Sequence, residues 1–120
     1  MEKINTRNFF KELKKAVPEF DLYDRPYVHN TLINLRCRLR DLILESGNKQ
    51  NTKPLIKRAT NFISKCWYHG SNHIQNAVMV SFFEDIPKRL YKEIRHYLTK
   101  DLAKEIRRYQ KAWDKFCHRK

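Results

Sequence analysis

Basic side chains recur at helical spacing along the last third of the chain, and they are the best-defined surface feature that the sequence predicts. They are Lys88, Lys92, Arg95, Lys100, Lys104, Arg107, Arg108, Lys111 and Lys115. At about 100° per residue, those after residue 99 occupy one broad sector of a helix, nearly opposite Leu102, Ile106 and Tyr109. Such a face can bind phosphates or carboxylates, or it can be the solvated side of an amphipathic helix. If the helices carrying these residues are antiparallel neighbours, the two stripes join into one basic surface.

Two cysteine–histidine clusters have the residue types that bind metals or act as nucleophiles. Cys66, His69 and His73 lie within eight residues of one another, and a thiolate and imidazoles can share a zinc ion. No fourth ligand is supplied locally, however, and Cys66 falls on the apolar face of its helix. We therefore expect a buried cysteine and two turn histidines rather than a metal site. Cys117 and His118 are adjacent in a segment that we expect to fray, and catalysis requires rigid geometry.

The acids Glu84 and Asp85 are the remaining candidates for chemistry. Adjacent residues of a helix diverge by about 100°, so the two carboxylates cannot work as one acid–base pair. We expect one of them to form a half-buried ion pair with an arginine of a neighbouring helix. The chain has no glycine-rich phosphate loop and no nucleophile elbow, and only two glycines in all. The sequence therefore predicts a non-catalytic protein with no cofactor, metal or small-molecule substrate.

Composition narrows the class of partner. The 120 residues suit a single domain, 1–120. There are 26 Lys and Arg against 13 Asp and Glu, which gives a net charge of +13. The positive electrostatic field of such a chain favours nucleic acid, an anionic membrane or an acidic protein as a partner, or the charge only keeps the chain soluble.

The three cysteines are far apart and odd in number, which argues against a disulfide framework. Because no signal peptide or membrane span is recognisable, we expect a cytoplasmic protein without a membrane partner.

Apolar spacing is helical almost everywhere, so the fold class predicted is all-α with five to six helices. The expected helices cover residues 6–17, 28–46, 54–70, 72–86, 88–98 and about 99–116. Ser71 or Asn72 can cap the fourth, and Thr99 can cap the last. The aromatic residues Phe20, Tyr23 and Tyr27 are expected to pin the loop before the second helix to the core.

The segment 72–86 differs from the rest of the chain. No basic residue occurs from Ala77 to Pro87, and little polar face remains after Asn76. A helix that is apolar nearly all round belongs in the middle of a domain. The run VMVSFF could also form a buried strand, but no other segment offers it a strand partner. We therefore predict a short α-solenoid, HEAT-like arrangement or a compact bundle around this buried helix.

The same segment carries a resemblance. Asn76, Ala77, Val78, Val80, Ser81 and Glu84 form the pattern N-A-V-x-V-S-x-x-E, after Phe62, Ile63 and the turn at 70–72. This pattern is similar to that of a family of small, uncharacterised bacterial all-helical proteins, and the likeness extends from Phe9 to Trp113. Some members look like immunity proteins that neutralise antibacterial toxins. The resemblance implies a helical scaffold without catalytic residues, although this chain is basic where relatives are often acidic.

The function predicted is therefore binding. The leading hypothesis is a cytoplasmic immunity protein that binds a protein toxin with an acidic surface through the nine basic residues. Tyr91 and Trp113 are its possible aromatic anchors if either is exposed. The alternatives are a nucleic-acid-binding helical module that uses the same basic residues, and an adaptor or assembly protein.

Overall fold

The structure is a computed structural model that describes residues 3–20, 27–46 and 52–117, except the side chains of residues 45–46 and 113–117. Within that part the chain forms helices and no strand, as the sequence predicts. The α-helices are α1 (Phe9–Ala16), α2 (Val28–Ser46), α3 (Lys53–His69), α4 (Asn72–Ala77), α5 (Lys88–Ile94) and α6 (Lys100–Cys117). A π-helix, η1 (Val78–Phe83), continues α4, and a 3-10 turn, η2 (Arg95–Tyr97), follows α5. None of the described helices combines the length and apolar character needed to cross a membrane.

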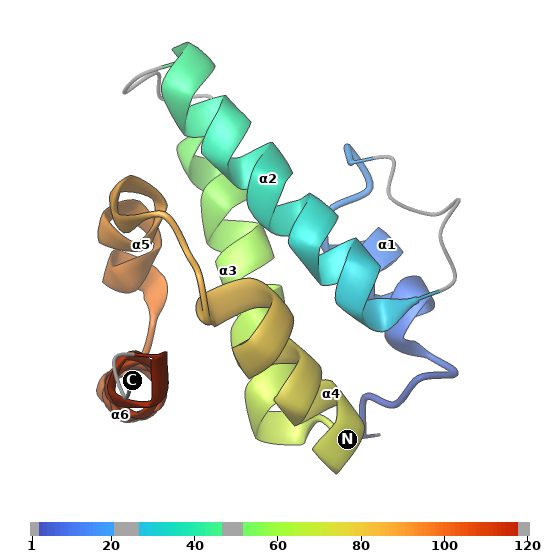
Figure 1. Cartoon of the computed structure of the whole chain (residues 1–120). Helices are drawn as coiled ribbons and strands as arrows, with labels where there is room; N and C mark the ends of the chain where they lie inside the picture. Colours follow the sequence, from blue (N-terminus) through green and yellow to red (C-terminus); the bar gives the residue numbers. More distant parts are fainter. Residues whose placement is uncertain (1–2, 21–26, 47–51, 118–120) are drawn as a thin grey trace.

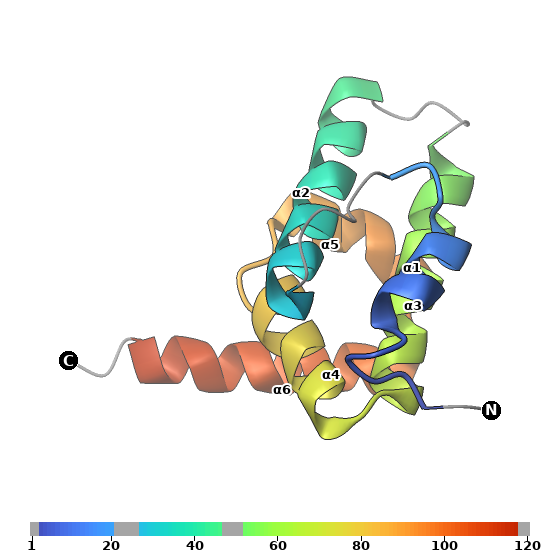
Figure 2. The same cartoon turned by 90° about the vertical axis from the view of Figure 1, so that its right-hand side faces the viewer.

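The helices pack around the continuous segment formed by α4 and η1. This segment lies along α2 and also contacts α3 and α6. Helix α1 packs against α3 on one side of the molecule, and α5 and α6 lie on the opposite side (Figure 1). Helix α6 runs along the base, and its C-terminal end extends past the other helices (Figure 2). The arrangement agrees with the predicted helical domain built around residues 72–86.

Segment 72–86 is buried as predicted, but it is not one regular helix. The α-helical part ends at Ala77, and residues 78–83 form a π-helix, in which hydrogen bonds span five residues rather than four. Phe82 and Phe83 are both fully buried, with ring centroids 4.9 Å apart and planes at 84°. Consecutive side chains leave a helix in different directions. Both rings are buried because other helices cover more than one side of η1.

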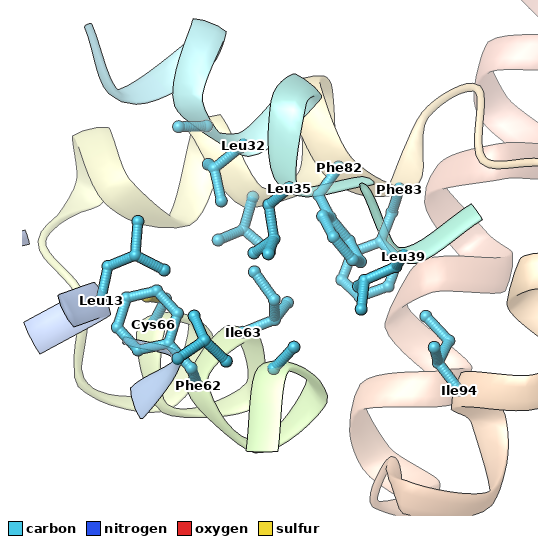
Figure 3. Packing of buried hydrophobic residues seen from close by; sticks show 14 of the residues in the cluster. Leu13, Leu32, Leu35, Leu39, Phe62, Ile63, Cys66, Phe82, Phe83 and Ile94 are labelled. Atoms are coloured by element: carbon cyan, nitrogen blue, oxygen red, sulfur yellow. The ribbon is translucent and has the colours of Figure 1, made fainter. Parts of the chain in front are cut away.

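The core is continuous across the helices. Side chains from α1, α2, α3, η1 and α5 converge in it, including Leu13, Leu35, Ile63, Phe82 and Ile94 (Figure 3). Two buried hydroxyl groups, those of Thr31 and Thr60, donate to the carbonyl oxygens four residues earlier, at 2.9 and 2.8 Å. Because these buried polar groups have partners, they do not carry the cost of an unsatisfied donor.

A tight turn at Gly70 joins α3 to α4 and holds the N-terminal segment. The Ile4 amide donates to the His69 carbonyl, and the Ser71 amide donates to the Ile4 carbonyl, both at 2.8 Å. A Cβ atom at Gly70 would lie 2.1 Å from the Cys66 carbonyl oxygen, so only glycine fits. The Ser71 hydroxyl accepts the Ile74 amide at 3.4 Å, which confirms the predicted cap of α4.

The predicted aromatic loop is only partly correct. Phe20 is buried, as expected, but Tyr27 is 66% exposed and does not pin the loop to the core. The backbone of Tyr27 is fixed instead, because its carbonyl oxygen accepts the amide and the hydroxyl of Thr31. The helix then turns Val28 and Thr31 inward, which leaves the Tyr27 ring outside. Tyr23 lies outside the described residues.

Replacing Gly70 by alanine tests the turn. Overpacked sites typically lose about 1–3 kcal/mol, and we expect Gly70→Ala to lower the free energy of unfolding by about that amount, measured by urea denaturation. The matched control is Asn76→Ala, at an exposed position of α4, where a change within roughly 0.5 kcal/mol is expected. Equal stability of Gly70→Ala and the wild type would show that the turn can relax.

Candidate functional site

The turn between α5 and α6 sets the geometry of the predicted basic surface. The helix expected over 88–98 ends at Ile94 and tightens into η2 before α6 begins. The Thr99 hydroxyl accepts the Leu102 amide at 3.2 Å, so the predicted cap of α6 is confirmed. The same hydroxyl is hydrogen-bonded to the phenolic oxygen of Tyr68 on α3. The turn is therefore attached to the body of the protein at the start of α6.

The two helices that carry the basic residues run in roughly opposite directions, one above the other (Figures 1 and 2). Leu90 and Ile94 of α5, and Leu102 and Ile106 of α6, are buried and hold the helices to the core. The remaining faces of α5 and α6 carry the cations. The helices are therefore antiparallel neighbours, which is the arrangement in which the sequence predicts that the two basic stripes join.

An open pocket of about 300 Å³ lies where α5 and α6 meet, and we call it the α5–α6 pocket. It is lined by Tyr91, Arg95, His96, Leu98, Thr99, Lys100, Ala103 and Arg107. Three of these side chains are cationic, and none of the residues that line the pocket is a carboxylate. Tyr91 and Leu98 are half-buried and supply apolar wall. The pocket therefore combines positive charge with apolar surface.

All predicted basic residues whose side chains the structure describes are exposed. They are Lys88, Lys92, Arg95, Lys100, Lys104, Arg107, Arg108 and Lys111. Of these, only Arg108 forms an ion pair with another described residue, Glu105, at 3.0 Å. The side chains of Lys115 and Trp113 lie outside the described part. Arg95, Lys100 and Arg107 come together in the α5–α6 pocket, whereas the other five do not line it.

Arg108 belongs to a different face from Arg107. It lines a second pocket, of about 260 Å³, together with Trp67, Met79, Glu105 and Tyr109. Adjacent helical positions diverge by about 100°, which accounts for the separation. The predicted stripe on α6 is therefore divided between two faces, and only the one containing Arg107 joins α5.

The two acids that end the central segment do not behave as predicted. Neither Glu84 nor Asp85 forms an ion pair with a described residue. Glu84 is half-buried and lies close enough to Tyr109 to act on it. Partial burial raises the pKa of the Tyr109 phenol, and the Glu84 carboxylate raises it further. Among the described residues, Glu84 therefore lies near a neutral phenol and forms no ion pair with an arginine.

Of the cysteine–histidine cluster, Cys66 is fully buried, as predicted. The two histidines were expected in the turn, but His69 is the last residue of α3 and His73 lies in the first turn of α4; both are exposed. Burial raises the pKa of the Cys66 thiol to about 12. The side chain of Cys117, and His118 as a whole, lie outside the described residues. Cys66 is therefore a core residue with a thiol that stays protonated at neutral pH.

One contact among polar residues was missed by sequence reasoning. His29, in the first turn of α2, places its Nδ1 atom 2.5 Å from the Ser81 hydroxyl oxygen in η1. The His29 ring also lies edge-on to the His73 ring, with centroids 5.7 Å apart. His29 and Ser81 are 52 residues apart in the chain. No spacing within one helix could have indicated this contact, because it depends on how α2 packs against α4 and η1.

Comparison with known protein families gives one match. Residues 7–114 match a domain of unknown function, DUF7674. The chain belongs to this family. The DUF7674 region includes the whole α5–α6 pocket and the contact of His29 with Ser81, and it ends one residue before Lys115. Neither the curated proteins nor the solved structures gave a match.

The cap of α6 can be tested by substitution. Replacing a capping Ser or Thr by Ala typically costs about 1 kcal/mol, and Thr99→Ala also removes the hydrogen bond with Tyr68. We expect a loss of about 1–2 kcal/mol in the free energy of unfolding, measured by chemical denaturation. Thr99→Ser keeps the hydroxyl group and should lose less than half as much. Equal losses in the two variants would mean that the methyl group, not the cap, stabilises the turn.

The Cys66 thiol gives a second test. In a Cys117→Ser background, a thiol reagent at pH 8 should label the half-buried Cys37 first and Cys66 only after denaturant is added. The pKa of Cys66 in the folded protein, about 12, lies above its ordinary value of 9.0. The folded state therefore holds this proton more tightly, so stability should fall as pH rises above about 9. Labelling of both thiols at equal rates in the native protein would contradict the burial of Cys66.

Proposed function

We propose that this protein acts by binding, and that its partner is a protein with an acidic surface that docks at the α5–α6 pocket. In the bacterial setting that the sequence resemblance suggests, the partner is an antibacterial toxin and the protein is its immunity protein. The observation that carries the proposal is the pocket itself. Three exposed cations and apolar wall meet there, and none of its lining residues is a carboxylate.

The chemistry of the pocket suits a carboxylate carried on an apolar or aromatic patch. Arg95 and Arg107 have planar guanidinium groups that can bind a carboxylate through two parallel hydrogen bonds. Tyr91 and Leu98 can cover the apolar part of the same contact and exclude water from it. Binding hot spots typically combine such anchors with charged pairs that lose their water. A partner that presents Glu or Asp beside an apolar side chain therefore fits best.

The charge around the pocket favours fast capture. Residues 88–115 contain ten Lys and Arg against four Asp and Glu. Such a field accelerates encounter with an oppositely charged protein and selects against basic ones. An immunity protein must find its toxin before the toxin acts, so a high association rate has a direct use.

The one described contact of a serine with a histidine does not favour catalysis. Ser81 is only 4% exposed and lines none of the pockets described above. Among the described residues, no carboxylate is hydrogen-bonded to His29 to orient it as a base. A nucleophile must be reached by its substrate and activated by an oriented base. These features support binding rather than chemistry.

Nucleic acid is the second candidate partner, and a separate observation favours it. Exposed basic residues also lie on other faces, among them Arg7, Lys11 on α1, Arg38 on α2 and Lys57 on α3. Positive charge spread over several helices suits a polyanion that wraps or slides, because each phosphate contact contributes without regard to sequence. Binding of this kind would depend on total charge rather than on the α5–α6 pocket.

Two double charge reversals of equal size separate these possibilities. Arg95→Glu with Arg107→Glu alters the pocket, whereas Arg7→Glu with Lys11→Glu alters the α1 side by the same net charge. We expect the pocket variant to bind a toxin encoded beside the gene at least tenfold more weakly and to lose protection of cells that express the toxin. The control should stay within about threefold.

Other outcomes contradict the proposal in distinct ways. Equal weakening of both variants, together with retarded migration of RNA or DNA that disappears steeply with salt, would favour the nucleic-acid alternative. Full protection by the pocket variant would show that the α5–α6 pocket is not the contact site. Absence of any protection by the wild type would exclude the immunity role for the toxin tested.

A further inference from the structure

The side chains of His29, Ser81 and His73 come together where α2 packs against α4 and η1. The start of α2 lies beside α4 in both views of the molecule (Figures 1 and 2), and the two histidine rings meet there. Their centroids are 5.7 Å apart and their planes are at 86°. Two imidazoles that each place a nitrogen about 2.1 Å from one tetrahedral ion have ring centres roughly 5–6 Å apart. The observed separation falls in that range.

The hydrogen bond to Ser81 prepares His29 for this role. Its Nδ1 atom lies 2.5 Å from the Ser81 hydroxyl oxygen, which can accept a hydrogen bond as well as donate one. When Nδ1 carries the proton and its N–H donates a hydrogen bond to the Ser81 hydroxyl oxygen, the free lone pair lies on Nε2, the other ring nitrogen. Metal-binding histidines are held in this way by a second hydrogen-bonding partner, which fixes both tautomer and ring orientation.

Burial gives the site a fixed half and an adjustable half. Ser81 is buried in η1 and His29 is half-buried, so the first ligand is held in place. His73 is exposed near the start of α4, so its ring can turn toward an ion without moving the core. The site is open to solvent on the His73 side, and water can occupy the remaining coordination positions.

We propose that His29 and His73 bind one divalent transition-metal ion, with Ser81 as the positioning residue for His29. Imidazole ligands suit copper, nickel and zinc, and copper(II) should bind most tightly. No group of three or more His, Cys, Asp or Glu residues converges within the described part of the chain. In this proposal the remaining coordination positions are therefore left for water. The ion would link the first turn of α2 to α4.

Copper(II) titration followed by electron paramagnetic resonance tests the proposal. The wild type should show a copper signal coupled to two imidazole nitrogens. His73→Ala changes only an exposed side chain and should bind copper at least tenfold more weakly, with coupling to one nitrogen. His29→Ala should behave alike, and Ser81→Ala should weaken binding several-fold while keeping both nitrogens. The controls are His69→Ala and His96→Ala, which remove exposed histidines elsewhere and should leave the affinity unchanged.

Zinc(II) provides a second, independent readout. A ligand that binds only the folded state raises the melting temperature, so excess zinc should raise that of the wild type and not that of His73→Ala. Copper affinity in His73→Ala equal to that of the wild type would overturn the proposal. A wild-type copper signal with one nitrogen, or loss of binding in His96→Ala, would also overturn it.

Discussion

The structure depends on burying residues 78–83 on several sides at once. This short segment contributes Phe82, Phe83 and three more buried side chains, and α2, α3 and α6 all pack on it. A chain with a net charge of +13 repels itself when it is compact. The apolar contacts of the core, those of this segment among them, must outweigh that repulsion. The absence of any lysine or arginine from Ala77 to Pro87 follows from this demand, because an unpaired buried cation would oppose it.

The same packing places the basic residues outside. The amide of Gln110 on α6 donates to the Phe83 carbonyl at 3.2 Å, where the π-helix ends. Leu102 and Ile106 of the same helix are fully buried. Because these contacts fix the inner face of α6, the opposite face must point to solvent. The packing of α6 against η1 and the core therefore determines where the α5–α6 pocket lies.

The sequence predicts those features that depend on neighbouring residues. Helical periodicity located the helices, and hydroxyl residues at Ser71 and Thr99 located two caps. Features that depend on distant residues were missed. The π-helix arises where several helices cover η1, and the contact of His29 with Ser81 joins residues 52 positions apart. The α5–α6 pocket forms only because α5 and α6 run in roughly opposite directions beside each other. From the sequence we could say only that the two basic stripes would join if the helices were antiparallel neighbours.

The basic stripe on α6 has parts with different electrostatic roles. Arg108 has Glu105 as a partner, so its charge is partly compensated. Arg107 instead shares a pocket with Arg95 and Lys100, and no carboxylate lines that pocket. Like charges held close together oppose folding, although solvent screens much of the effect. An anionic group bound in the pocket would relieve that repulsion and gain the attraction of all three cations. This difference gives Arg107 a stronger claim than Arg108 to a role in binding, although the two are adjacent in sequence.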